Sequence, residues 1–329
     1  KERECQAAKG EPMADLIDIE MLDNNLCRCT GYRPLLNACR SFAAPSEHEA
    51  LSPLCYGGHE SYTPERTSPR SKPIVGYDPG EADPTFPSFL DGRPSIRPLA
   101  MPSQSDGHAW HRVASLADVA ALLTQHEGRA RLVVGNTTRA NAAWIKAQPE
   151  TVLVDVTAVP ELAEAKVADG RCFIGGAVTI SAAIRLLETS RDALSADQSP
   201  AFPSLIEHLG RIGGRNVRNQ AGAVGNLVLA KFDSTLGSDF AVLMAALPDA
   251  TMHIIHASSP SKNRKEPFWE WLTEPWTPAA RQQIIVGVSF ALGEAGDRFQ
   301  SFEVAQRGQN CGAIVNAAFS LRGAGRGAA

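Results

Sequence analysis

Residues 220–228 read Gln-Ala-Gly-Ala-Val-Gly-Asn-Leu-Val, a glycine-rich turn that runs directly into an apolar segment. Small residues at such a turn let the backbone approach a bulky group, and its N–H groups can surround a phosphate. Gly213 and Gly214 lie shortly before it, and Arg215 or Arg218 could add positive charge. The residues alone leave two interpretations open: a pyrophosphate-binding turn, or a glycine-rich loop that closes two lobes.

A second turn of this kind ends a short apolar run. Residues 132–138 read Leu-Val-Val-Gly-Asn-Thr-Thr, so a buried strand is predicted to end at Gly135-Asn136. Backbone N–H groups there, with the Thr137 and Thr138 hydroxyls, could hold a phosphate, but an ordinary strand-to-turn junction gives the same pattern. We expect no helix directly after residue 222 and find no spaced acidic residue, which disfavours a Rossmann dinucleotide fold.

The bulk composition excludes several classes of protein. A chain of 329 residues suggests two or three domains. The net charge of −4 gives no basic surface for nucleic acid, and no run reaches the roughly eighteen apolar residues of a membrane span. The first residues form no apolar core of a secretory signal, and seven cysteines without a framework pattern favour a reducing compartment. We therefore expect a cytoplasmic protein that binds neither nucleic acid nor membrane.

From about residue 108 the hydrophobic pattern alternates between strands and helices, as in an α+β domain. Three expected helices begin at a residue that can cap them: Ser115 for 115–125, Thr179 for 180–189, and Ser238-Asp239 for 240–247. Further helices are expected at 141–146 and 203–211. Strands are expected at 131–134, 151–156, 171–178, 224–229, 251–256, 284–292, 302–306 and 313–322.

The first hundred residues have a different character. Residues 1–44 read as two short helices around Cys27-Arg28-Cys29, and residues 45–107 contain half of the chain's 22 prolines, which indicates a linker. Thiolates one residue apart can hold two corners of a metal site. Zinc and iron–sulfur sites take four ligands, so Cys27 and Cys29 cannot complete one alone. A pair of ordinary thiols explains the spacing equally well.

The residues around these cysteines resemble a known signature. Residues 25–35 read Asn-Leu-Cys-Arg-Cys-Thr-Gly-Tyr-Arg-Pro-Leu and are similar to the end of the second [2Fe–2S] domain of the molybdenum hydroxylases, the xanthine dehydrogenase/aldehyde oxidase family. Residues 132–138 and 221–229 resemble that family's first and second FAD-binding loops, the second most like plant-type aldehyde oxidases. Further matches follow in the family's order at 86–90, the end of the linker, and at 316–319, in the C-terminal lobe.

The resemblance implies the fold class and the domain order. We expect an α+β protein with the C-terminal part of a helical [2Fe–2S]-binding domain, a proline-rich linker, and a two-lobed FAD-binding domain of the PCMH (vanillyl-alcohol-oxidase-like) type. The start of a C-terminal flavoprotein lobe and a short tail follow. The corresponding ranges are 1–44, 45–107, 108–292, 293–322 and 323–329.

The resemblance also implies cofactor sites. Cys27 and Cys29 would hold a [2Fe–2S] cluster jointly with two cysteines of an upstream motif that this chain lacks. Ser238 and Asp239 would be the pair that lies against the flavin. The implied FAD-binding residues are Leu132, Val133, Val134, Gly135, Asn136, Thr137, Thr138, Gly222, Gly225, Asn226, Ser238, Asp239 and Ile285.

In family terms, a molybdenum centre oxidises an aldehyde or a purine, and electrons pass through [2Fe–2S] clusters to FAD and on to O2 or NAD. The molybdenum cofactor would sit in a separate molybdopterin-binding domain or subunit, and the other cluster in an upstream ferredoxin-like domain. A homodimer is expected from the same resemblance. This chain would be the FAD and iron–sulfur electron-transfer segment of such an oxidoreductase, in which the cofactors carry the redox chemistry and no side chain need act as acid or base.

Two departures from the family pattern keep other hypotheses open. Val224 occupies the first glycine position of the usual Gly-Gly-Asn, where its side chain would crowd a pyrophosphate. Glu303 stands where the family usually has Lys or Arg near the flavin, and a carboxylate there opposes negative charge on the cofactor. The alternatives are a non-catalytic remnant that acts as an interaction module, and a stand-alone flavin oxidase.

Overall fold

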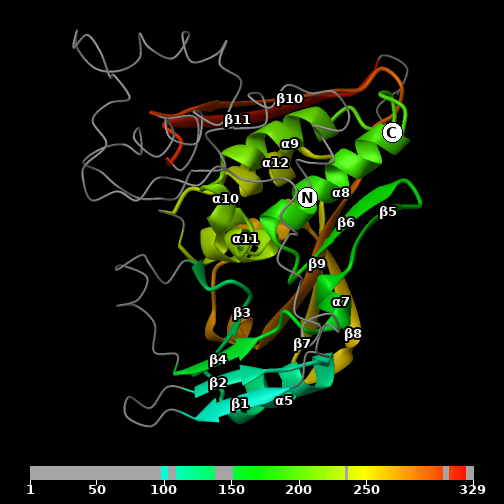
Figure 1. The fold of residues 1–329 in the computed structure, drawn as a ribbon. Coiled ribbons are helices and arrows are strands. Elements are labelled where there is room, and N and C mark those ends of the chain that lie inside the picture. Colours follow the sequence, from blue (N-terminus) through cyan, green and yellow to red (C-terminus); the bar gives the residue numbers. More distant parts are fainter. Residues whose placement is uncertain (1–97, 103–108, 138–150, 234–235, 307–310, 324–329) are drawn as a thin grey trace, which may run out of the picture. The chain divides into compact units, whose positions relative to one another are not determined.

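The computed structural model describes residues 98–102, 109–137, 151–233, 236–306 and 311–323 (Figure 1). The chain divides into two compact units, Lys1–Ser95 and Ile96–Ala329, and every described residue belongs to the second. The expected iron–sulfur remnant and the helix expected at 141–146 therefore lie outside the described residues. Within the described part, no helix is long and apolar enough to cross a membrane.

The first described part of the chain forms a small lobe. Its four-stranded sheet has the order β1-β2-β4-β3, with β1 antiparallel to β2 and the other pairs parallel. The elements are β1 (Leu99–Pro102), β2 (Ala109–Arg112), α5 (Leu116–Gln125), β3 (Ala130–Val133) and β4 (Val152–Asp155). A buried cluster that includes Val119, Leu123 and Val154 joins α5 to this sheet.

The larger lobe is a five-stranded antiparallel sheet of order β5-β6-β9-β7-β8, lined on one face by helices. Its strands are β5 (Ala165–Ala168), β6 (Arg171–Gly175), β7 (Thr251–His256), β8 (Ser259–Pro267) and β9 (Gln283–Ala291). The helices are α7 (Pro160–Ala163), α8 (Ile180–Ala193), α9 (Phe202–Arg211), α10 (Arg215–Arg218), α11 (Ala223–Phe232), α12 (Asp239–Ala246), α13 (Phe268–Thr273) and the 3-10 helix η5 (Pro278–Gln282).

The main core lies between this sheet and the helices. Strand side chains such as Ile174 and Phe290 pack against Leu187, Leu205 and Leu227 of the helices, and all five are fully or almost fully buried. Burying such side chains contributes roughly 1.5–3 kcal/mol each relative to exposure. The other face of the sheet meets the small lobe through the second buried cluster, so the two lobes share a packed boundary.

A two-stranded ribbon ends the described chain. Strands β10 (Arg298–Val304) and β11 (Val315–Leu321) pair antiparallel, and the ribbon lies across α9 and α12 (Figure 1). The inward side chains of the ribbon include Phe299, Glu303 and Asn316. On its outward face, alternate positions are apolar and more than half exposed: Phe302, Val304, Val315, Phe319 and Leu321.

The three capped helices expected from the sequence are confirmed. Ser115, Thr179 and Ser238 each accept a hydrogen bond from the backbone N–H three residues later. The prediction of a strand at 224–229 is wrong, because this segment lies in α11. Its buried residues include Val224 and Leu227, which share one helical face, and a short apolar run fits a buried strand or a buried helix equally well.

The predicted linker also needs a correction. Residues 99–102 form strand β1, which pairs with an unforeseen strand at 109–112. Short strands of this kind owe their stability to the partner strand, so local composition gives little sign of them. The Rossmann fold is excluded by the antiparallel order of the large sheet, although a helix does follow Gly222 directly.

Candidate functional site

A cavity of about 300 Å³ opens where the small lobe meets α11 and β9. Most of its lining comes from four stretches of chain. These are residues 130–137 in and after β3, 212–232 around α10 and α11, 271–276 around α13, and 280–285 at the start of β9. Val156, Leu162, Gly176 and Ile180 complete the lining. The two glycine turns therefore converge on one cavity, although Gly135 and Gln220 lie 85 positions apart in the sequence.

The two turns touch each other through their backbones. Gly135 lies so close to Gln220 that a Cβ atom at residue 135 would overlap the Gln220 carbonyl group. A Cβ atom at Gly222 would lie 3.2 Å from the side chain of Val134. Next to Gly135, Asn136 has a φ of 51°, and its side-chain oxygen accepts a hydrogen bond of 2.8 Å from Arg131. The contact between the turns fixes one wall of the cavity.

Helix α11 begins at this wall. Its N-cap is Gly222, which has no side chain to cap the first backbone N–H groups. The Ala223 N–H donates to the Val178 carbonyl over 2.9 Å, whereas the geometry of a helix start leaves the next N–H groups without intrahelical acceptors. A Cβ atom at Gly225 would meet nothing within 4 Å. An uncapped helix start beside open space favours an anionic group.

The sequence suggested that the Val224 side chain would crowd a pyrophosphate, but the structure places it differently. Val224 is 2% exposed and belongs to the main buried core. It also borders the cavity. Gly225, the next residue, is the one with open space at its Cβ position. The glycine that leaves room at the start of α11 is therefore present.

Asn226 connects the cavity to α12. The Ser238 hydroxyl donates to the Asn226 side-chain oxygen over 2.5 Å, and the same hydroxyl accepts the Ala241 N–H at the start of α12. The next residue, Asp239, accepts a hydrogen bond of 2.5 Å from the Asn316 amide of β11. Through these contacts the cavity, α12 and the ribbon form one connected polar network.

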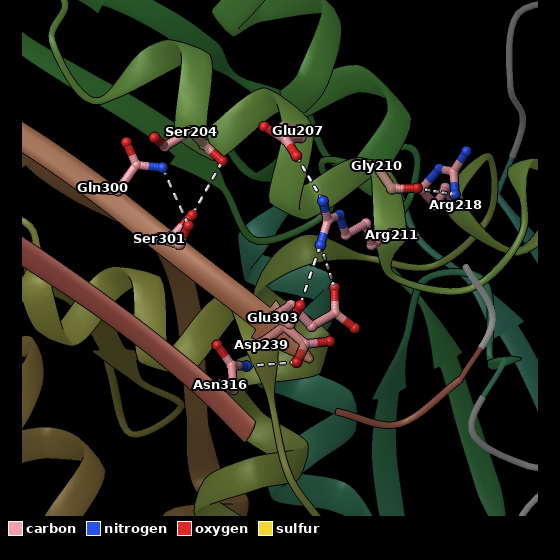
Figure 2. Close-up of polar contacts among 10 residues, drawn as sticks. All are labelled: Ser204, Glu207, Gly210, Arg211, Arg218, Asp239, Gln300, Ser301, Glu303 and Asn316. Atoms are coloured by element: carbon pink, nitrogen blue, oxygen red, sulfur yellow. Dashed lines mark hydrogen bonds and ion pairs between the residues drawn. The ribbon is translucent and has the colours of Figure 1, made fainter. Parts of the chain in front are cut away.

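Charged groups gather around Asp239, as Figure 2 shows. Arg211 of α9 donates to Glu207 over 2.6 Å and lies 3.9 Å from the carboxylate of Glu303 on β10. Burial raises the pKa of Asp239, and His208 and the Asn316 hydrogen bond oppose this rise. Burial also raises the pKa of Glu303, the Asp239 carboxylate raises it further, and Arg211 lowers it.

The structure brings together most of the residues implied for FAD. Ser238 contacts the site through Asn226, whereas the Asp239 carboxylate points to the ribbon and is absent from the cavity lining. Thr138, Cys27 and Cys29 lie outside the described residues. The predicted residues that line the cavity are Leu132, Val133, Val134, Gly135, Asn136, Thr137, Gly222, Gly225, Asn226 and Ile285.

Sequence reasoning missed an aromatic wall. Phe232, Trp271 and Trp276 line the same cavity, and the rings of Phe232 and Trp276 meet edge to face with centroids 5.4 Å apart. The sequence allows the tryptophans at 269, 271 and 276 either to cover a flavin or a partner domain or, the favoured interpretation, to pack locally in a proline-rich loop. The structure places Trp271 in α13, where it is 1% exposed. The signal available was three tryptophans within eight residues, with no indication of which ones turn inward.

The described residues hold no group of three or more His, Cys, Asp or Glu side chains that could bind a metal ion. Cys172, in β6, is fully buried, and this burial raises the pKa of its thiol to about 12. A thiol so strongly disfavoured as a thiolate fits a packing role.

Comparison with known proteins identifies this architecture. A family model described as the FAD binding domain in molybdopterin dehydrogenase matches residues 103–290, more than half of the chain. The chain belongs to this family. The predicted resemblance to the molybdenum hydroxylases is thereby confirmed, as is the fold class of the FAD-binding domain. The match contains the two turns that meet at Gly135 and Gln220.

Curated relatives of this FAD-binding domain include plant aldehyde oxidases. Abscisic-aldehyde oxidase of Arabidopsis thaliana is 30% identical over 311 residues, which is 91% of this chain and 22% of that protein. An indole-3-acetaldehyde oxidase of Zea mays is 29% identical over 92% of this chain and 21% of its own length. The chain thus spans about a fifth of the length of these relatives.

Solved structures agree on the fold. Carbon monoxide dehydrogenase from Hydrogenophaga pseudoflava, in a form that lacks the Mo-pyranopterin moiety of the molybdenum cofactor, superposes with a TM-score of 0.54 at 21% identity. The superposition covers 68% of this chain and 71% of that one. Quinoline 2-oxidoreductase from Pseudomonas putida 86 gives a TM-score of 0.50 at 24% identity, over 66% and 69% of the two chains.

Proposed function

We propose that this chain binds FAD in the cavity between its lobes and serves as an electron-transfer segment of a molybdenum-dependent hydroxylase. The observation that supports this most directly is the convergence of the β3 turn and the start of α11 on one cavity. FAD, when bound, supplies two-electron chemistry with a donor and an acceptor. The residues of this chain bind and orient it.

The residues present fit the cofactor. A pyrophosphate carries negative charge, and the uncapped N-terminus of α11 beside Gly225 offers backbone N–H groups and the positive end of a helix dipole. Asn136 and Asn226 border the same space with amide groups. A volume of about 300 Å³ lies at the low end of the roughly 300–1,000 Å³ typical of small-molecule sites, so it accommodates part of a dinucleotide.

The polar network behind the cavity holds these groups in place. Ser238 fixes the Asn226 side chain, and the Asn316 amide fixes Asp239 one residue further on. Such support for a binding residue keeps its geometry close to the productive one. We expect Ser238 and Asp239 to contribute mainly as positioning residues.

Measuring FAD binding tests the proposal. The purified chain is incubated with excess FAD, freed of unbound cofactor by gel filtration, and examined for the visible absorbance of oxidised flavin. We expect about one FAD per chain, a stoichiometry set by the single described cavity that joins the two glycine turns. A folded chain that retains no flavin would contradict the proposal.

The role within a larger enzyme extends the proposal. We infer that electrons reach this FAD from [2Fe–2S] clusters, one of them held partly by Cys27 and Cys29, and leave to O2 or NAD. The aldehyde- or purine-oxidising site would lie in a molybdopterin-binding domain or subunit, with a ferredoxin-like domain upstream and a homodimeric assembly. The names of the relatives, aldehyde oxidases, support an aldehyde as the substrate class.

A second candidate function is an interaction module without catalysis. The outward face of the β10–β11 ribbon favours it, because Phe302, Phe319 and Leu321 are each more than half exposed. Quantifying iron and flavin in the same preparation separates the hypotheses. Because Cys27 and Cys29 supply only two of the four cluster ligands, the chain is prepared together with an upstream segment that supplies the other two. Flavin with iron then indicates the electron-transfer segment, flavin without iron a stand-alone flavin oxidase, and neither cofactor an interaction module.

A further inference from the structure

A second cavity, of about 750 Å³, lies over one face of the large sheet, and all five strands contribute to it. Its central row follows the strand pairing: Ser289 of β9 pairs with Phe173 of β6 on one side and with Thr251 of β7 on the other. Residues paired in this way present their side chains on the same face of a sheet. The residues that line this cavity and those that line the cavity at the glycine turns form two separate sets.

The floor of this second cavity is built around a buried serine. Ser289 is 4% exposed, and its hydroxyl lies 2.9 Å from Nε2 of His253 and accepts a hydrogen bond of 3.2 Å from Arg171. The Phe173 ring meets the His253 ring edge to face, with centroids 5.3 Å apart. Gly287 leaves the space for this ring, because a Cβ atom there would lie 2.5 Å from it. These contacts fix the places of the arginine and the histidine on the sheet.

Two cations at this cavity have no acidic partner. Arg171 donates to neutral oxygens, the Asp249 carbonyl at 2.7 Å and the Ser289 hydroxyl, and Lys265 of β8 pairs with His253 of β7. Within the described part of the chain, neither cation forms an ion pair. Burial lowers the pKa of His253, and Lys265 and Arg171 lower it further. The histidine is therefore held neutral beside two positive charges, and an anion would relieve the repulsion between them.

The carboxylates that line the cavity are paired or lie at turns. Glu164 forms an ion pair of 2.6 Å with Lys166. Asp169 and Asp249 are exposed residues with positive φ angles of 51° and 49°. Water and salt screen carboxylates in such exposed positions. These groups therefore leave the two cations available to a ligand.

We propose that this cavity binds the oxyanion of a small organic acid, a carboxylate or a phosphate, through Arg171 and Lys265. A guanidinium presents its N–H groups in a fork that matches either oxyanion, and an ammonium adds a compact positive charge. Phe173 and Pro267 supply apolar surface for the body of the ligand. The volume falls within the roughly 300–1,000 Å³ typical of small-molecule sites. The site does not depend on FAD, because it shares no lining residue with the other cavity.

Ligands of one shape and different charge test the proposal. Benzoate, phenyl phosphate and the neutral benzamide are titrated into the full-length chain, and their dissociation constants are measured by NMR. Arg171→Gln and Lys265→Gln are compared with Arg264→Gln. Arg264 is a matched control because it is the next residue on β8 and pairs with Ile254, a residue of the core on the other face. Thermal unfolding checks Arg171→Gln, which loses two hydrogen bonds, while the exposed Lys265 gives an independent variant.

We expect both anions to bind about tenfold more tightly than benzamide, because only they form charge-assisted hydrogen bonds. Lys265→Gln should weaken their binding by about threefold to fivefold, the effect of one exposed charge. Arg171→Gln should weaken it by about tenfold or more, and Arg264→Gln should bind as the wild type does. Tighter binding of phenyl phosphate than of benzoate would assign a phosphate to the site, and the reverse a carboxylate.

A signal from the cavity itself locates the ligand. The ring-proton resonances of His253, identified by their loss in His253→Gln, should shift when benzoate is added to the wild type and stay unchanged in Arg171→Gln. Three results would overturn the proposal: no binding of either anion, equal affinity for benzoate and benzamide, or equal benzoate affinity in wild type and Lys265→Gln. Each of these results leaves the proposed FAD site untouched, because the two cavities are separate.

Discussion

Gly135 and Gln220 pack backbone against backbone, with no space between them for even a methyl group. This contact joins the turn after β3 in the small lobe to the turn before α11 in the large lobe. Both turns line the cavity, so its shape depends on how closely the two lobes approach at this point. A glycine at 135 is therefore a requirement of packing as much as of ligand binding.

Substituting the two glycines separates packing from binding. Gly135→Ala should destabilise the chain by about 1–3 kcal/mol, because the new methyl group forces the Gln220 backbone away, and FAD binding should weaken with it. Gly225→Ala has open space at its Cβ position, and alanine in a helix is favoured by up to about 1 kcal/mol, so stability should be retained. Its methyl group should still weaken FAD binding. Urea unfolding and flavin titration measure both effects; equal stability of the two variants would contradict this explanation.

The hydroxyl of Ser238 has two tasks that a second serine can separate. Ser238→Ala removes the cap of α12 and the hydrogen bond to Asn226, whereas Ser115→Ala removes the cap of α5 and an exposed hydrogen bond to the Asp118 carboxylate. Each cap is worth roughly 0.5–2 kcal/mol, so both variants should lose similar stability. FAD affinity should fall by several-fold, the value of about one hydrogen bond, only in Ser238→Ala. An equal fall in both would point to general loosening of the fold.

The buried carboxyl group of Glu303 predicts a pH dependence of stability. Its pKa is raised in the folded chain, chiefly by burial, so the folded state holds a proton that the unfolded state releases. The free energy of unfolding should then fall as pH rises from the ordinary carboxyl pKa through the raised one. Glu303→Gln should remove this part of the fall and be relatively more stable at neutral pH.

Neighbouring groups define the control for that experiment. Burial raises the pKa of Asp239 and adds a fall of the same sign, while burial lowers the pKa of His208, whose contribution rises with pH toward its ordinary value. The His208 contribution persists in the variant, whereas the Asp239 contribution changes with Glu303 because the two carboxylates interact, so the difference between wild type and Glu303→Gln reports Glu303 together with its coupling to Asp239. Glu207→Gln removes the exposed partner of the same Arg211 and should follow the wild-type pH curve. Parallel curves for Glu303→Gln and wild type would refute the role of Glu303.

The buried ammonium of Lys231 should matter for stability. Lys231→Met keeps most of the side-chain volume but leaves the Trp271 and Glu274 carbonyls without their donor, at a cost of about 1–3 kcal/mol. Lys262→Met, at an exposed position of β8, should change stability by less than about 0.5 kcal/mol. Urea unfolding of both variants gives the comparison. Equal midpoints would show that the cost of burying the charge cancels its hydrogen bonds.

Local chemistry in the sequence predicted local structure well. The starts of α5, α8 and α12 could be predicted from their capping residues, Ser115, Thr179 and Ser238, because a cap depends on residues three positions apart. The strand predicted after Gly222 was wrong because an apolar run of six residues satisfies the requirements of a buried helix and of a buried strand. Strand β1 was missed because it depends on pairing with β2.

Only part of the candidate site could be predicted from the sequence. Family resemblance pointed to Gly135, Asn136 and Asn226, and the structure places all three at one cavity. Spacing could not reveal that the turns touch at Gly135 and Gln220, because that contact depends on how two lobes pack. For the same reason the place of Trp271 and Trp276 in the cavity wall emerged only from the fold, although both residues were visible in the sequence.

The outward face of the β10–β11 ribbon has a practical consequence for handling this protein. Five apolar side chains on one flat ribbon, including the edge-to-face pair Phe302 and Phe319, present a surface that water solvates poorly. In concentrated solution such surfaces collide and adhere, and sulfate strengthens the attraction. We therefore expect this face of the ribbon to limit the concentration at which a titration can be run.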